Sequence, residues 1–129
     1  MNADALAVLK QNIAHFDLSN VTVVAGDAGE RLKDIETPPD YAFIGGTKGR
    51  LAAILDELYG KNEACAIVVT AITIETLAVL TAYYGSRRDY ELDITQVSTA
   101  RSQKVGASHL MMAQNPIYIV TIVRKDETR

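Results

Sequence analysis

The sequence predicts an α/β fold organised around a mixed β-sheet. Stretches with a helical hydrophobic period alternate with short β-branched stretches, which is typical of parallel strands with helices packed on the sheet. The last two expected strands, Tyr90–Ser98 and Ile117–Val123, follow each other without a helix between them. Strands joined in that way can be antiparallel, so we expect a parallel sheet that becomes mixed at its end.

Composition limits the classes of function. The chain has 129 residues, of which 48% are hydrophobic, and its net charge is −3. These values fit one soluble globular domain, and the lack of a basic stripe argues against a nucleic-acid binder. Cys65 is the single cysteine, as expected for a reducing compartment. No apolar run reaches the roughly 20 residues of a membrane span and no signal peptide opens the sequence, so we expect a cytoplasmic protein without a membrane partner.

The N-terminal part is expected to contain a helix and a short strand. Asn2 can cap a helix that runs to about Asp17, and its apolar stripe consists of Leu6, Leu9, Ile13 and Phe16. The expected strand Val21–Ala25 ends in Gly26-Asp27-Ala28-Gly29. An acidic residue just past a strand can reach a ligand at the carboxyl edge of a sheet. Local signals alone favour the simpler interpretation of Asp27, a helix cap or turn.

A glycine-rich segment follows the next expected strand, Asp40–Ile44. It reads Gly45-Gly46-Thr47-Lys48-Gly49, and its glycines would let backbone amides approach a ligand closely. A flexible turn between strand and helix explains the same residues equally well. The spacing matches neither the dinucleotide-binding nor the Walker pattern, because no Gly-Lys-Ser/Thr follows a four-residue spacer.

The middle of the chain predicts a helix, an interior strand and a second helix. The first helix should end at Gly60, and its buried face would be Leu51, Ile54, Leu55 and Leu58. Cys65–Ala71 does not alternate in hydrophobicity, so we expect a central strand. Thr70-Ala-Ile-Thr73 then leads into a helix that Thr73 can cap and Gly85 ends.

The segment before the last strand shows neither a helical nor a strand period. It carries Arg101, Lys104 and His109 around Gly106, and a long loop of this kind inside a compact domain is usually functional or disordered. We therefore expect a loop that closes over a ligand, although a structural histidine and a surface ion pair remain the simpler explanations of His109 and Arg101. Ile117–Val123 is apolar at both alternating sets of positions, so it should be an interior strand covered on both faces.

Three candidate segments follow strands of the expected sheet: Gly26–Asp27, Gly45–Gly49 and Thr70–Thr73. Ligands of such sheets bind outside the carboxyl ends of the strands. We therefore expect the three segments to meet at one edge.

The ordered set of these motifs resembles a known family. The set comprises Gly26-Asp27-Ala28, Asp40-Tyr-Ala-Phe-Ile-Gly45-Gly46 with Gly49, Thr70-Ala-Ile-Thr73-Ile-Glu75, Val97-Ser98-Thr-Ala-Arg101 with Gly106, His109, and Asn115-Pro116-Ile-Tyr-Ile. The chain resembles the precorrin C15-methyltransferases that also decarboxylate, which act in cobalamin biosynthesis. The family fold is the class I, Rossmann-like sheet of S-adenosylmethionine-dependent methyltransferases, whose last two strands form an antiparallel hairpin.

The resemblance implies a cofactor, a substrate and residue roles. The cofactor would be S-adenosyl-L-methionine, and the substrate a precorrin tetrapyrrole that is methylated at ring carbon 15 and decarboxylated at an acetate side chain. Cofactor-binding residues would be Gly26, Asp27, Ala28, Gly45 and Gly46. Substrate-binding residues would be Gly49, Thr70, Thr73, Arg101, Lys104 and His109. Neither step requires a metal or a protein nucleophile, and the resemblance singles out no catalytic residue.

The chain departs from the family at its start. The family's first block, a strand ending in Asp-x-Gly-x-Gly-x-Gly with a helix and a second strand, has no counterpart here. We therefore expect residues 1–124 to form a partial methyltransferase domain that is truncated at the N-terminus, followed by a charged tail, 125–129. The strands that lose neighbours would leave open edges, which predicts self-association or a rearranged N-terminal part; the family forms tetramers.

Two other functions remain possible on this basis. The chain could be a catalytically silent fragment that only assembles with itself or a partner. A nucleotide-binding, flavodoxin-like module is less favoured because no phosphate loop is visible.

Overall fold

The computed structural model describes residues 3–47 and 49–125, and it divides into two compact units, Met1–Thr37 and Pro38–Arg129. The first unit contains helix α1 (Ala3–His15), helix α2 (Ala28–Arg31) and the 3₁₀ helix η1 (Leu32–Asp34). The expected helix cap at Asn2 and the residues of the charged tail after Lys125 lie outside the described residues. None of the described helices is long and apolar enough to cross a membrane.

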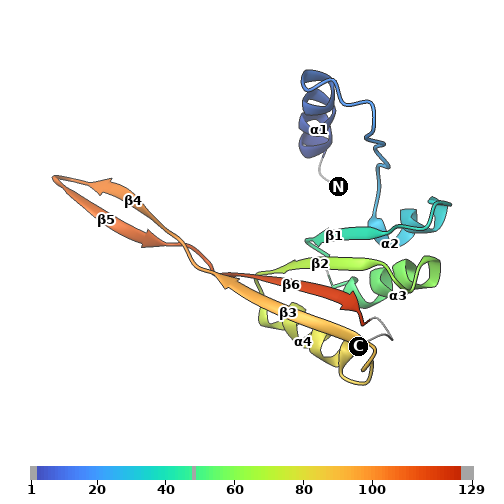
Figure 1. Ribbon diagram of the computed structural model, residues 1–129. Helices are drawn as coiled ribbons and strands as arrows, with labels where there is room; N and C mark the ends of the chain where they lie inside the picture. The colour runs from blue at the N-terminus through green and yellow to red at the C-terminus, as the bar shows by residue number, and fades with distance from the viewer. Residues whose placement is uncertain (1–2, 48, 126–129) are drawn as a thin grey trace. The chain divides into compact units, whose positions relative to one another are not determined.

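The second unit is built on a four-stranded mixed sheet (Figure 1). Its elements are β1 (Tyr41–Gly45), α3 (Leu51–Lys61), β2 (Ala66–Ala71), α4 (Ile74–Tyr84), β3 (Tyr90–Val97), β4 (Ala100–Val105), β5 (Ser108–Ala113) and β6 (Ile117–Arg124). The strand order is β1-β2-β6-β3. β1 and β2 are parallel, whereas β6 is antiparallel to both β2 and β3. The expected mixed sheet with an antiparallel final pair is thus confirmed.

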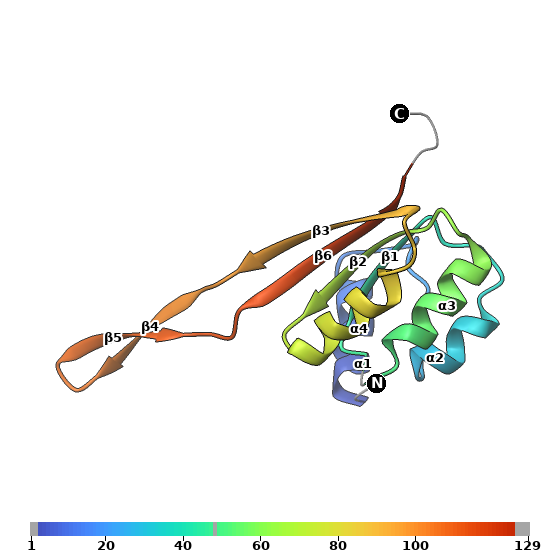
Figure 2. The ribbon, with the colours of Figure 1, turned by 90° about the horizontal axis from the view of Figure 1, so that it is seen from below.

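The core lies between this sheet and the two helices on one of its faces (Figure 2). The sheet contributes Ile67, Val69, Val120 and Ile122, and the helices contribute Leu51, Leu55 and Leu80. The predicted interior positions of β2 and β6 are confirmed. Burial nevertheless alternates along both strands, with Val68 and Thr121 less buried than their neighbours. The expectation that β6 is covered on both faces is wrong within the second unit, because α3 and α4 lie on the same face.

One predicted strand and one predicted helix end are wrong. Val21–Ala25 is not a strand, because no described strand pairs with it and an isolated extended segment has no ladder to join. Gly60 does not end its helix, since α3 continues to Lys61 and Asn62 provides its C-cap. The brief helical turn after Asp27 and the end of α4 at Gly85 are confirmed.

The expected loop before the last strand is instead a β-hairpin that continues β3 and β6 beyond the main sheet (Figure 1). β4 and β5 pair antiparallel, and a two-residue turn, Gly106-Ala107, joins them. Gly106 has φ +61°, as required at the first position of a type II′ turn. Every residue of β4 and β5 is exposed, so no buried side of the hairpin imposes an alternating sequence pattern.

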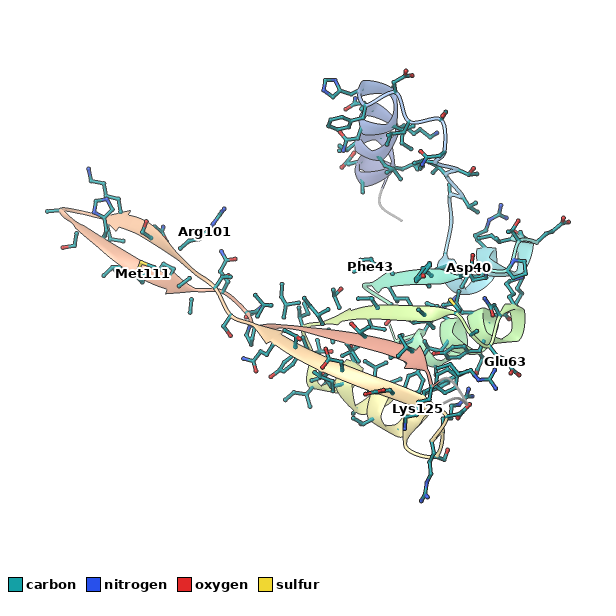
Figure 3. All side chains as sticks on the ribbon, viewed as in Figure 1. Asp40, Phe43, Glu63, Arg101, Met111 and Lys125 are labelled. Atoms are coloured by element: carbon teal, nitrogen blue, oxygen red, sulfur yellow. The ribbon has the colours of Figure 1, made fainter. Side chains whose placement is uncertain are left out.

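A tyrosine cluster joins α3, α4 and β3 at the end of the sheet opposite the hairpin. The Tyr59 and Tyr84 hydroxyls are hydrogen-bonded at 2.7 Å, and the Tyr90 hydroxyl donates to the Glu63 carbonyl at 2.8 Å. The Arg87 guanidinium lies 4.2 Å from the Tyr83 ring centroid. Figure 3 labels Asp40, Glu63 and Lys125 at this end and Arg101 and Met111 on the hairpin. The cluster therefore stabilises the end of the unit that is remote from the carboxyl ends of β1 and β2.

Candidate functional site

The candidate site is a cavity of about 420 Å³ at the carboxyl ends of β1 and β2. Its lining residues are Gly46, Thr47, Gly49, Thr70, Ile72, Thr73 and Thr76. Two of the three predicted segments, Gly45–Gly49 and Thr70–Thr73, therefore meet as expected. The cause is the parallel pairing of β1 with β2, which places Gly45 directly opposite Thr70.

The glycines at the end of β1 have distinct geometric roles. Gly45 faces β2, where a Cβ atom would come within 3.4 Å of the Thr70 hydroxyl oxygen. Gly46 and Gly49 have φ values of +65° and +83°, which L-amino acids with side chains rarely adopt. The segment therefore leaves β1 through two left-handed residues and keeps its backbone close to the cavity. Lys48, which the sequence placed in this segment, lies outside the described residues.

The other side of the cavity is formed by the start of α4. Thr73 is the N-cap of this helix, and its hydroxyl accepts a hydrogen bond from the Thr76 amide at 3.2 Å. The two threonine hydroxyls are 2.8 Å apart. The predicted cap is confirmed, and the cap places the helix N-terminus, with its partial positive charge, beside the cavity.

The described lining is neutral, since it consists of glycine, threonine and isoleucine. Hydroxyl groups and backbone amides can hydrogen-bond a ligand there, and Ile72 adds an apolar surface. Among the described residues, no group of three or more His, Cys, Asp or Glu could hold a metal ion. The described lining thus offers hydrogen bonds and an apolar surface but no charged side chain.

Gly26, Asp27 and Ala28 belong to the first unit. Asp27 is the N-cap of α2, and its carboxylate accepts a hydrogen bond from the Gly29 amide at 3.0 Å. Gly26 has φ +139°, and a Cβ atom there would lie 2.6 Å from Cγ of Arg31. The structural role of Asp27 is therefore the helix cap that local signals favoured. A cofactor role for these residues and their meeting with the other two segments remain predictions.

The hairpin separates the three cationic candidates that the sequence had grouped in one loop. Lys104 pairs directly with His109, so these side chains share one face. Arg101 pairs with Met112 and differs from Lys104 by an odd number of residues, so it lies on the other face. One ligand on one face of the hairpin cannot contact all three, and the expected single group is corrected accordingly.

Three cavity residues were not among the predicted site residues: Thr47, Ile72 and Thr76. Each lies within or beside a predicted segment, so its position along the chain was the signal that could have identified it as a site residue. Ile72 directly follows the buried Ala71 at the end of β2, which is where a side chain leaves the core for the edge of the sheet.

Comparison with solved structures first defines the fold class of the chain. The rRNA methylase from Streptococcus thermophilus superposes with a TM-score of 0.70 over 97% of this chain and 70% of that one. At 12% identity the likeness shows the fold alone, which is the Rossmann-like fold expected from the sequence. The sheet is thus that of a Rossmann-like methyltransferase fold.

The chain belongs to the precorrin methyltransferase family, because the sequence model for the precorrin methyltransferase domain matches residues 1–124. The structure of precorrin-6Y C5,15-methyltransferase from Geobacter metallireducens is 30% identical, with a TM-score of 0.79 over 96% of this chain and 63% of that one. A probable cobalt-precorrin-6B C(15)-methyltransferase (decarboxylating) from Sulfurisphaera tokodaii is 31% identical over 91% of this chain. The resemblance seen in the sequence is confirmed. The chain spans 60% of the length of that relative.

Proposed function

We propose that this chain takes part in S-adenosylmethionine-dependent methylation of precorrin ring carbon 15, coupled to decarboxylation of an acetate side chain, in cobalamin biosynthesis. The observation that carries the proposal is the family match over residues 1–124, together with a cavity where that fold binds its ligands. Residues 1–124 would then act as one partial methyltransferase domain. The names of the relatives support the substrate and the coupling of the two reactions.

The chemistry depends on positioning more than on reactive side chains. S-adenosylmethionine would supply an activated methyl group, and the residues around the cavity would hold the ring carbon in position to receive it, because alignment of this kind can lower a barrier substantially. The decarboxylation releases carbon dioxide, leaves its electron pair in the tetrapyrrole system and takes up a proton. Gly45 and Gly46 would lie beside the cofactor, and Gly49, Thr70 and Thr73 would face the substrate.

Asp27 is proposed to bind the adenine half of the cofactor. A hydrogen bond to a charged group contributes about 1.5–3 kcal/mol, which corresponds to tenfold or more in affinity. The hairpin would supply cations for the precorrin carboxylates, because arginine binds carboxylates bidentately. Its two faces imply that Arg101 and the pair Lys104–His109 contact different parts of the substrate or of the assembly.

Calorimetric titration with S-adenosylmethionine tests the cofactor site. We expect weak, sub-millimolar binding that Asp27→Ala abolishes and Asp27→Asn weakens about tenfold, because asparagine keeps the helix cap without the charge. Asp34→Asn is the matched control, since Asp34 is a carboxylate of the same unit that pairs with Arg31 at 2.9 Å. If Asp34→Asn lowers the affinity for S-adenosylmethionine as much as Asp27→Asn does, the assignment of Asp27 to the cofactor site is contradicted.

Assembly without catalysis is the second candidate, and the exposed edge of β1 favours it. In the described sheet β1 is an outer strand that pairs only with β2, and its Tyr41 and Phe43 side chains are 84% and 72% exposed. Open apolar edges pair with other chains. We infer a homo-oligomer on this ground. An absence of heat in the titration, with folded protein, would support the silent fragment over the enzyme.

A further inference from the structure

Three apolar side chains are exposed where the main sheet meets the hairpin. They are Ile72, Val97 and Ile117, with exposed fractions of 63%, 40% and 41%. Single exposed apolar residues are common, whereas a group of them indicates a binding surface. Of the three, Ile72 also lines the cavity. None of the three contributes to the core between the sheet and helices α3 and α4.

The strand register places these side chains on the same side of the sheet. Val97 pairs with Ile117, and Ile119, two residues further along the same strand, pairs with Thr70. Side chains two residues apart along a strand share a face, so Ile117 and Thr70 lie on one side. Ile72 lines the same cavity as Thr70. We call Ile72, Val97 and Ile117 the apolar ledge.

The chemistry of the surroundings selects the occupant. Beside the ledge, the described cavity lining offers hydroxyl groups and backbone amides but no charge. Among the described residues that follow Val97 along the chain, the first cationic side chain is Arg101, four residues further on, which is about 13 Å along an extended strand. A ligand that fits this sequence of surfaces has a broad apolar body and acidic groups at its periphery. A tetrapyrrole ring with carboxylate side chains has that form.

We propose that the broad face of the tetrapyrrole ring lies against the apolar ledge, with its acidic side chains directed toward the hairpin. The proposal rests on the proposed function, because that function supplies the class of substrate. It adds Ile72, Val97 and Ile117 as positioning residues. Their contacts would hold the ring beside the cavity while the reacting carbon faces the cofactor.

Titration with uroporphyrin III, followed by its absorbance and fluorescence, tests the ledge. This probe is a tetrapyrrole with carboxylate side chains. We expect Ile72→Ser and Val97→Ser each to weaken binding several-fold, and the double variant at least tenfold. Serine is neutral, so the loss would report lost apolar contact and not repulsion of the carboxylates.

Ile94→Ser is the matched control. Ile94 lies on the same strand as Val97 and is 48% exposed, but it pairs with the buried Val120 and so faces the other side of the sheet. We expect the affinity of Ile94→Ser for uroporphyrin III to stay within twofold of that of the unsubstituted protein. The circular dichroism spectra of all variants should be unchanged. Wild-type affinity in the double variant, equal loss in the control, or no binding by the unsubstituted protein would overturn the proposal.

The same preparations separate this proposal from the proposed function. Cofactor binding that depends on Asp27, with porphyrin binding that is independent of the ledge, would reject the ledge and keep the enzyme. Ledge-dependent porphyrin binding without any cofactor binding would support the ledge and reject methyl transfer by this chain.

Discussion

Thr73 illustrates how one side chain serves both the fold and the candidate site. Its hydroxyl accepts a hydrogen bond from the Thr76 amide and so satisfies one of the backbone donors that have no partner within the helix at the start of α4. The same residue lines the cavity, and the segment from Thr70 leads directly to it. Replacing it should therefore change stability and, under the proposed function, ligand binding, unless the substitution keeps the cap.

We predict that Thr73→Ala lowers the free energy of unfolding by about 1 kcal/mol, because the helix loses its N-cap. Thr73→Ser should stay within a few tenths of a kcal/mol of the unsubstituted protein, since serine caps equally well. Urea unfolding followed by circular dichroism measures both values. If serine costs as much as alanine, the cap is not the source of the stability.

At the scale of secondary-structure elements, the tyrosine cluster holds α3 and α4 together. Burial raises the pKa of Tyr59 to about 12, although the hydrogen bond from Tyr84 opposes the shift. Burial also raises the pKa of Tyr84, and its hydrogen bond with Tyr59 raises it further. The folded state thus favours the neutral hydroxyls. The stability gained in this way is fully present below pH 10.0, the ordinary pKa of tyrosine, and is lost as the pH rises toward the pKa of the folded state.

We predict that the chain loses stability as the pH rises from about 10 to about 12, because unfolding then releases protons that the folded cluster retains. The Tyr59→Phe/Tyr84→Phe double variant removes both hydroxyls and should show a shallower loss. Tyr41→Phe is the control, because the Tyr41 side chain is almost fully exposed and lies outside the cluster. Urea unfolding midpoints at about pH 9 and pH 11 measure the loss of stability in each variant. An equal loss in the double variant and in Tyr41→Phe would contradict the prediction.

At the scale of the whole molecule, the described part of the sheet ends in an edge strand, β1. β1 pairs with β2 on one side only, and Tyr41 and Phe43 alternate with Ala42 and Ile44, which face the helices. Neither proline nor a charged residue interrupts Tyr41–Gly45, although such residues commonly protect sheet edges. The described sheet therefore has an open edge of the kind predicted from the sequence, and we expect this edge to pair with another chain.

We predict that the average mass in solution rises with protein concentration, and that Phe43→Lys shifts the distribution toward the monomer. A charge on the edge strand opposes strand pairing. Ile74→Lys is the control, since Ile74 is exposed at the start of α4 and outside the sheet. Sedimentation velocity measures the distribution, and a compact monomer at high concentration would refute the prediction.

The local sequence determined those features that short segments encode. The sequence predicted the four strands of the main sheet, and the uninterrupted apolar runs of β2 and β6 identified these two as interior strands. The hydroxyl of Thr73 and the glycine at Gly85 identified both ends of α4. The ordered motifs identified the family and, with the parallel strands, the meeting of Gly45–Gly49 with Thr70–Thr73. These inferences hold because periodicity, capping and turn residues act over a few positions.

Tertiary structure alone decided the features that depend on pairing between distant segments. Val21–Ala25 has the composition of a strand but no described partner, and β4 and β5 pair with each other without a buried side to impose a sequence period. Their register places Arg101 and Lys104 on opposite faces. Which face of β6 is buried was decided by the helices packed against it, because burial is a property of neighbours and not of the strand's own residues.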